Sequence, residues 1–117
     1  MPYTLLIVED PKQRGTRTLA EGEEVYDRMV KFSERLKSQG LLLATQSLMS
    51  NDSAARLQVR DGKTSIIDGP FTEAKEMIGG FFLLDCSTRE QALAIAAQCP
   101  AAQWATVEIR EAGPCFM

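Results

Sequence analysis

Hydrophobic and polar positions predict short strands and two amphipathic helices along this chain. An apolar run over residues 3–9 ends at Asp10-Pro11 and is typical of a buried strand. Residues 20–39 follow a helical period, and Gly40 stands where a left-handed C-terminal cap is expected. The apolar positions of this helix are Val25, Met29, Phe32 and Leu36.

The middle of the chain predicts a strand followed by a β-hairpin. Strand character returns over residues 41–49, and a turn cluster follows at 50–53. Residues 55–60 alternate, and Asp61-Gly62 favours a two-residue type I′ loop, which needs positive φ at both positions. This loop sets a register in which apolar positions meet across the ladder. The pairs are Val59 with Thr64 and Leu57 with Ile66, and the returning strand ends in Asp68-Gly69-Pro70-Phe71.

The last part of the chain predicts a strand, a helix and a strand. A charged segment over residues 73–76 is expected to form a short helical turn before a strand at 80–86. Ser87 or Thr88 can cap the next helix, because an acidic or amide residue stands three positions on, as in a capping box. Pro100 ends that helix, and residues 104–110 alternate as in an edge strand.

Without the hairpin, the order of elements is βαββαβ. It predicts one α+β domain over residues 1–117, with a ferredoxin-like fold and an inserted β-hairpin. In that topology the first and third strands are central, and residues 5–8 and 81–84 are apolar on both faces. Two helices cover only one face, so roughly several hundred Å² of hydrophobic surface would stay in water. We therefore expect a homodimer with its sheets face to face, a dimeric α+β barrel.

Composition narrows the possible functions. Apolar residues make up 44% of the chain and charged residues 25%, which is a normal globular balance. The net charge is −3 and the basic residues are scattered, so nucleic acid is not expected as a partner. No segment approaches the ~20 apolar residues that cross a membrane. The 3 cysteines lack CxxC spacing and indicate a reducing cytoplasm.

Histidine is absent from the chain. Its absence excludes a Ser-His-Asp or Cys-His catalytic arrangement within one chain or a homodimer. The sequence also contains no dedicated metal motif and no phosphate loop such as GxxxxGK. We therefore expect no cofactor and no bound metal.

Several motifs in order along the chain resemble one known family. They are an opening strand YTLLIVED, the long string RLQVRDGKTSIIDGPFTEAKEMIGGFFLLD, an alanine-rich helix ending in QCPAA, and a closing VEIR. Together they resemble the YCII-related family, and specifically its DGPF subgroup. The resemblance covers nearly all of the chain.

The resemblance implies a dimeric ferredoxin-like fold and a pocket in each protomer near the end of the DGPF strand. It also implies an association with extracytoplasmic-function sigma factors. A histidine–aspartate pair is the proposed catalytic machinery in parts of the family. Because this chain has no histidine, only the aspartate carries over, onto Asp68.

Asp68 is the main candidate for catalysis and for ligand binding. It ends a strand beside Ile66, Ile67 and Phe71, where partial desolvation would suit a general acid or base. The structural interpretation is that an aspartate before Gly-Pro accepts hydrogen bonds from backbone N–H groups and holds a turn. The two interpretations are compatible.

Four other residues are candidates for ligand binding. Phe71 is expected to plug the core or to form a wall of the pocket. Lys75 can counter Asp68 or anchor an anionic ligand. Arg110 can orient a carboxylate through two hydrogen bonds, although a surface ion pair with Glu108 explains it as well.

The fourth candidate, Glu73, has an acidic neighbour three positions on. Glu73 and Glu76 would share a face of a helical turn, and exposed charges are the common reason for such a pair. With Asp68 they would also supply oxygen ligands suited to magnesium or calcium, although nothing in the spacing demands a metal.

Three functions follow from these observations. The first is a small-molecule-binding or regulatory accessory protein that uses a pocket near the DGPF strand without turnover. The second is a cofactor-independent enzyme, of a lyase or isomerase type, in which Asp68 acts as acid and base on a small organic acid. The third, a protein partner of a sigma-factor-type regulator, rests on the resemblance alone. The absence of histidine favours the first.

Overall fold

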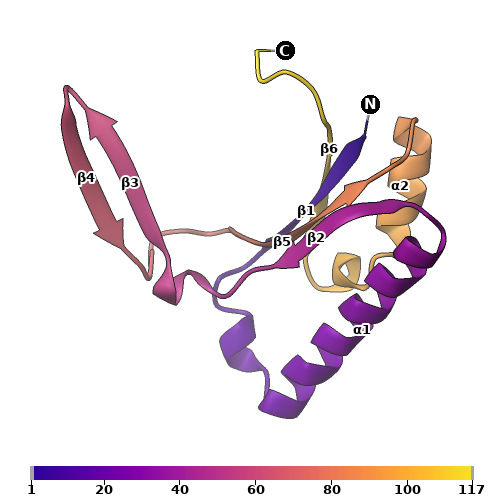
Figure 1. Cartoon of the computed structure of the whole chain (residues 1–117). Coiled ribbons are helices and arrows are strands. Elements are labelled where there is room, and N and C mark those ends of the chain that lie inside the picture. Colours follow the sequence, from indigo (N-terminus) through magenta and orange to yellow (C-terminus); the bar gives the residue numbers. More distant parts are fainter. Residues whose placement is uncertain (1, 117) are drawn as a thin grey trace.

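The computed structural model describes residues 2–116. In this part of the chain, two helices lie on one side of a four-stranded sheet, and a two-stranded hairpin projects away from it (Figure 1). The strands are β1 (Tyr3–Glu9), β2 (Leu42–Ser47), β3 (Ala55–Arg60), β4 (Lys63–Asp68), β5 (Met77–Leu84) and β6 (Thr106–Glu111). The helices are α1 (Leu19–Ser38) and α2 (Arg89–Gln98), and short 3₁₀ turns lie at Arg14–Thr16, Asn51–Ser53 and Pro100–Gln103.

The main sheet has the strand order β2-β5-β1-β6, and all of its neighbours are antiparallel. This mixed α+β arrangement is compatible with a ferredoxin-like fold. β1 and β5 are the central strands, as their apolar composition predicted. β5 begins at Met77, three residues before the predicted start, because the pair Gly79-Gly80 hides the strand pattern. β2 is shorter than the predicted 41–49.

Helix α1 begins with a capping box that the sequence analysis overlooked. The Thr18 hydroxyl accepts a hydrogen bond from the Glu21 N–H, and the Glu21 carboxylate accepts one from the Thr18 N–H. This backbone hydrogen bond lowers the pKa of Glu21. At the other end, Gly40 adopts a φ of 72°, which confirms the predicted left-handed cap. Thr88 caps α2 by accepting from the Gln91 N–H.

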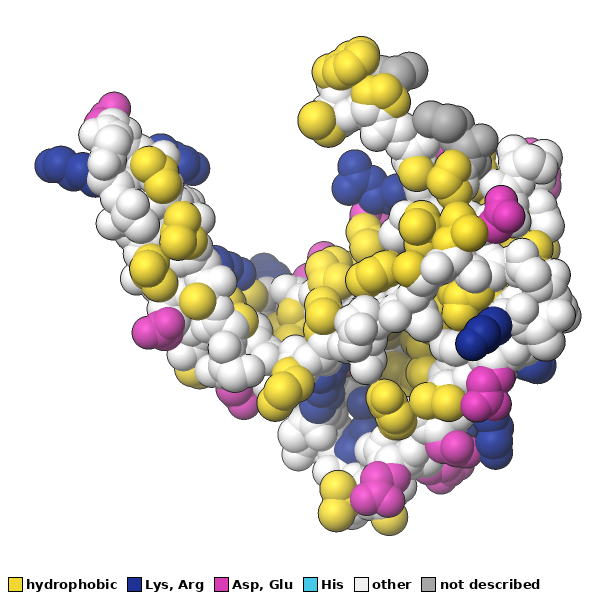
Figure 2. All heavy atoms as spheres, viewed as in Figure 1, with side chains coloured by type: hydrophobic (Ala, Val, Ile, Leu, Met, Phe, Trp, Pro, Cys, Tyr) yellow, Lys and Arg dark blue, Asp and Glu magenta, His cyan; other side chains and the backbone are white. Residues whose placement is uncertain are grey.

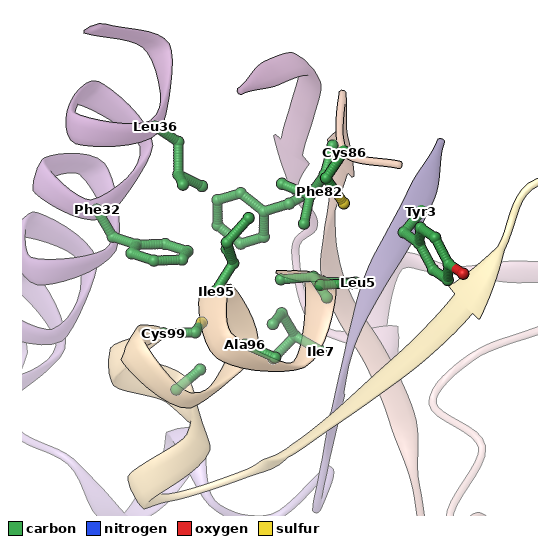
Figure 3. Close-up of a cluster of buried hydrophobic side chains, with 13 residues drawn as sticks. Tyr3, Leu5, Ile7, Phe32, Leu36, Phe82, Cys86, Ile95, Ala96 and Cys99 are labelled. Carbon is green, nitrogen blue, oxygen red and sulfur yellow. The ribbon is translucent and has the colours of Figure 1, made fainter. Parts of the chain in front are cut away.

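The hydrophobic core lies between the two helices and the inner face of the sheet (Figure 3). Phe32 of α1 packs edge-to-face on Phe82 of β5, with 5.3 Å between the ring centroids. Cys86 and Cys99 are buried in this core, and burial raises the pKa of both thiols. They therefore act as small hydrophobic residues, whereas Cys115 is exposed.

The outer face of the sheet is the one that the helices leave bare. Its central positions carry four apolar side chains of intermediate burial: Leu6 and Val8 of β1, and Phe81 and Leu83 of β5. We call these residues the open face. At the edge strand, Val107 and Ile109 pack against the core, so Glu108 and Arg110 lie on the open side of β6.

The hairpin of β3 and β4 forms a separate two-stranded antiparallel sheet. Val59 pairs with Thr64 and Leu57 with Ile66, in the register that the sequence predicted. Asp61 and Gly62 at the tip have φ values of 51° and 73°, as a type I′ turn requires. We call this element the arm, because it extends away from the body of the molecule (Figure 1).

Residues 72–76, which follow the arm, form no helix. They contain a turn closed by a hydrogen bond from the Ala74 N–H to the Phe71 carbonyl oxygen, at 3.0 Å. The prediction of a short helical turn here was therefore wrong. Glu73 and Glu76 therefore do not share a helix face: Glu73 lies 3.7 Å from Arg56, whereas Glu76 is paired with no basic side chain among the salt bridges of the described residues.

Candidate functional site

A cleft of about 640 Å³ lies where the base of the arm meets the open face of the sheet. Figure 2 shows hydrophobic side chains gathered in the hollow between the arm and the rest of the molecule. The apolar walls of the cleft include Val8, Leu48, Met49, Phe71, Met77 and Ile78. Its charged lining residues are Arg56, Glu76 and Glu108.

The Asp68-Gly69-Pro70-Phe71 segment positions one wall of this cleft. The Gly69 N–H donates a hydrogen bond to the Ala54 carbonyl oxygen at 2.7 Å, which ties the segment to the start of β3. Gly69 also lies so close to the Asn51 carbonyl that any Cβ would overlap it. The Gly69-Pro70 peptide is cis. The chain then places Phe71 against the cleft, where its side chain is buried.

Arg56 of β3 stacks on Phe71 at the edge of the cleft. Its guanidinium carbon lies 3.8 Å from the centroid of the Phe71 ring, within the range of a cation–π interaction. Its Nη1 is 3.7 Å from Glu73 Oε1, and this exposed pair is a weak one. The guanidinium is therefore oriented by the ring and has donors available for a ligand. Arg56 is not predictable from the sequence, because its approach to Phe71 depends on how the arm meets the loop.

A partly buried ion pair fixes the opposite wall of the cleft. Arg14 bonds to the Glu9 carboxylate through Nη2 at 2.6 Å and Nε at 3.3 Å, and its Nη1 donates to the Leu48 carbonyl at 2.8 Å. Glu9 is only 7% exposed. Its carboxylate lies against Gly79, where any Cβ would overlap it. The Leu48 N–H also donates to the Gly79 carbonyl. Leu48 is thereby held in place from both sides.

The structure brings together only part of the predicted site. Phe71 lines the cleft, and Glu73 reaches it indirectly through Arg56. Asp68 is exposed at the end of β4, opposite Ala55, and is not among the residues that line the cleft. Lys75 and Arg110 are exposed and also lie outside its lining. The roles predicted for these residues stay predictions.

In the part of the chain that the structure describes, no set of side chains is assembled to bind a metal ion. No group of three or more histidine, cysteine, aspartate or glutamate side chains within residues 2–116 is placed to hold an ion. Asp68, Glu73 and Glu76, the three oxygen ligands considered above, therefore do not converge. None of the helices between residues 2 and 116 has the length and the apolar character needed to cross a membrane.

Comparisons with known proteins place the chain in a family. The family model of the YCII-related domain matches residues 1–114. An uncharacterized protein of Rhizobium meliloti (strain 1021) is 31% identical over 93 residues, which are 80% of this chain and 75% of that relative. Because the family model matches almost the whole chain, the protein belongs to the YCII-related domain family.

Proposed function

We propose that this protein binds a small organic molecule with an apolar body and a single carboxylate, as a member of the DGPF subgroup. The observation that carries this proposal is the Arg56 guanidinium, stacked on Phe71 at the edge of an apolar cleft. A guanidinium in this position can donate two parallel hydrogen bonds to one carboxylate. A planar ligand can also continue the stack.

The dimensions and the chemistry of the cleft support a small ligand. Its volume of about 640 Å³ lies within the roughly 300–1,000 Å³ of small-molecule sites, and such sites are mostly apolar with few polar groups. Glu76 and Glu108 also line the cleft and repel a ligand with several negative charges. Nucleotides and other polyanions are therefore disfavoured, and a monocarboxylate with a hydroxyl or amine group is favoured.

Catalysis by Asp68 has less support than binding. The carboxylate is exposed and lies outside the lining of the cleft. A ligand held by Arg56 and the apolar walls would therefore not meet it directly. Binding without turnover, as in a regulatory accessory protein, is the function that the cleft supports best.

The proposal is tested with anilinonaphthalene sulfonate, an aromatic monoanion whose fluorescence rises in apolar sites. Arg56→Gln should weaken its binding by about tenfold, because a charge-assisted hydrogen bond and a stacked cation are lost. Arg60→Gln is the matched control, since Arg60 is also exposed on β3 but does not line the cleft. Equal affinities of the two variants would refute the role of Arg56.

A second measurement identifies the natural ligand. Native mass spectrometry of the purified protein should show a retained mass of a few hundred daltons, and Arg56→Gln should lower its occupancy while Arg60→Gln should not. A retained ligand with unchanged occupancy in Arg56→Gln would contradict the proposed anchor.

We also propose that the protein is a homodimer with the open faces of two sheets in contact. The half-buried side chains of Leu6, Val8, Phe81 and Leu83 lie side by side on the central strands, because Leu6 pairs with Phe81. Light scattering at micromolar concentration should give twice the mass of one chain. Phe81→Glu should return the mass to that of a monomer, and a monomeric wild-type protein would refute the dimer.

A further inference from the structure

The arm carries an apolar stripe on one of its two faces. The side chains of Leu57, Val59 and Ile66 are 61%, 54% and 62% exposed, respectively. Leu57 and Ile66 are directly opposite each other, and Val59 faces Thr64 on the same side of the ladder. The other face is mostly polar and basic, with Arg56, Gln58, Arg60, Lys63 and Ser65, and it also carries one exposed apolar side chain, Ile67, at its base. We call the first group the stripe.

The contacts of the arm do not explain its projecting position. Every residue of β3 and of β4 is exposed, so neither face of the arm packs on the core. A two-stranded hairpin in water is only marginally stable unless another surface covers its apolar side. With six residues in each strand, the arm is about 20 Å long. An element of this length with a bare aliphatic stripe is suited to contact a second molecule.

The surface area of the chain indicates how much of it a partner would cover. The accessible surface is 8236 Å² for a chain of 12.9 kDa. This exceeds the roughly 6,300 Å² of a compact monomer of that mass by about 1,900 Å². The radius of gyration is 16.0 Å, against about 13 Å for a compact domain of this length. The excess is more than twice the ~800 Å² that each partner buries in a standard interface.

The cleft is also incomplete in a single chain. Three of its apolar lining residues remain substantially exposed, with Leu48 at 42%, Ile78 at 43% and Met49 at 83%. These side chains form walls and leave one side open to water. The hollow between the arm and the open face, at whose base the cleft lies, is visible in Figure 2. A molecule seated in this hollow would contact Met49 and the Val8 end of the open face, and it would have to extend along the arm to reach the stripe, because the arm residue that lines the cleft, Arg56, is on the other face of the hairpin.

We propose that the arm is an intersubunit arm: it lies along a second copy of this chain, whose surface roofs the cleft. Each copy presents both a stripe and an open face, so a two-fold axis repeats the same contact on both sides. The excess surface is more than the ~800 Å² that each partner buries in a standard interface, so it suffices for a stable dimer. The inference rests on the proposed homodimer and adds to it that neither cleft is closed without the other subunit.

Two double variants of the arm test the stripe. Leu57→Glu with Ile66→Glu changes the stripe, whereas Gln58→Glu with Ser65→Glu changes the next cross-strand pair on the other face. Both variants add two negative charges at directly opposite positions, so repulsion inside the hairpin is matched. The stripe variant should raise the dimer dissociation constant at least tenfold, measured by light scattering over a concentration series, and the control should change it less than threefold. Equal effects of the two variants would overturn the proposal.

A measurement on the wild-type protein covers the case in which the stripe variant does not fold. Protomers labelled with ¹³C at isoleucine, leucine and methionine methyl groups are mixed with unlabelled protomers, and isotope-filtered NOEs are recorded. Ile66 and Leu57 should show NOEs to the unlabelled partner if the arm lies along it, and Met49 should show them if the partner roofs the cleft.

The outcomes separate the arm from the homodimer and from the binding function. A stable dimer without NOEs from Leu57, Ile66 or Met49 would overturn the intersubunit arm and leave the contact between open faces in place. A monomeric wild-type protein would overturn both. Binding of anilinonaphthalene sulfonate that depends on Arg56 in such a monomer would still support the cleft as a binding site.

Discussion

The body and the arm of this protein are held together in different ways. The body has a continuous core in which Leu5, Phe32 and Leu84 are at most 1% exposed, and its first helix begins with a reciprocal capping box. The arm has the cross-strand pairs of one hairpin and no buried residue. Side chains of the same chain therefore explain the shape of the body, whereas core packing within residues 2–116 does not explain the projection of the arm.

The cleft lies at the junction of these two regions and combines their properties. Its body side is fixed by the pair Glu9–Arg14, which also binds the carbonyl oxygen of Leu48. On the side of the arm, the cleft is lined by Arg56, whose side chain is 54% exposed and is oriented by Phe71. Under the proposed binding function, a hydrogen-bonded wall facing an exposed anchor would accommodate ligands of somewhat different shape.

The largest effect is expected from removing a core aromatic residue. Phe32→Ala should lower the free energy of unfolding by about 3–5 kcal/mol, because the ring is 1% exposed and packs on Phe82. Gln58→Ala on the polar face of the arm should change it by less than about 0.5 kcal/mol. Urea unfolding, followed by the fluorescence of Trp104, measures both. A loss above about 2 kcal/mol for Gln58→Ala would show that the arm belongs to the same cooperative unit as the body.

The contrast between body and arm also shows which structural features could be predicted from the sequence. Strand and helix periods are local, so both helices, the central strands and the hairpin register follow from the order of residues. The same holds for the tip of the arm, because Asp61-Gly62 specifies its own turn. The capping box of Thr18 and Glu21 is equally local, because the T-x-x-E spacing is its signature.

The site was less predictable because it depends on contacts between distant segments. Phe71 was identified from the motif around it, and the structure places it on the cleft wall. Arg56 and the pair Glu9–Arg14 gain their roles only when the arm, the loop before β5 and β1 come together. A period-two pattern determines how two strands pair but not the direction in which a hairpin projects. The projection of the arm from the sheet could therefore not be predicted from the sequence.

A smaller effect should come from the glycine that accommodates the partly buried ion pair. Gly79→Ala should cost about 2 kcal/mol of unfolding free energy, since its methyl group would overlap the Glu9 carboxylate and displace Arg14. The matched control is Gly22→Ala in helix α1, where nothing lies within 4 Å of the added methyl group. This control should stabilise the protein by about 0.5–1 kcal/mol.

The two glycine variants also connect the body to the cleft. If Arg14 moves in Gly79→Ala, the hydrogen bond to the Leu48 carbonyl weakens and that wall of the cleft shifts. Binding of anilinonaphthalene sulfonate should then fall in Gly79→Ala and stay unchanged in Gly22→Ala. Unchanged stability and binding in Gly79→Ala would show that the Glu9–Arg14 pair is not needed to hold this wall.

The smallest effect should appear at the start of helix α1, and it depends on pH. The backbone N–H of Thr18 stabilises the ionised Glu21 carboxylate and lowers its pKa below the value in the unfolded chain. The stabilisation is therefore complete above the unfolded pKa and is lost as the pH falls through the folded pKa. Glu21→Gln should destabilise the protein slightly at pH 7 and have a smaller effect at pH 3, as measured by thermal unfolding. Glu23→Gln serves as the control. It removes the same charge near the start of the helix, and Glu23 is not part of the capping box. A difference between Glu21→Gln and wild type that is the same at both pH values would show that charge at this position does not contribute to the cap.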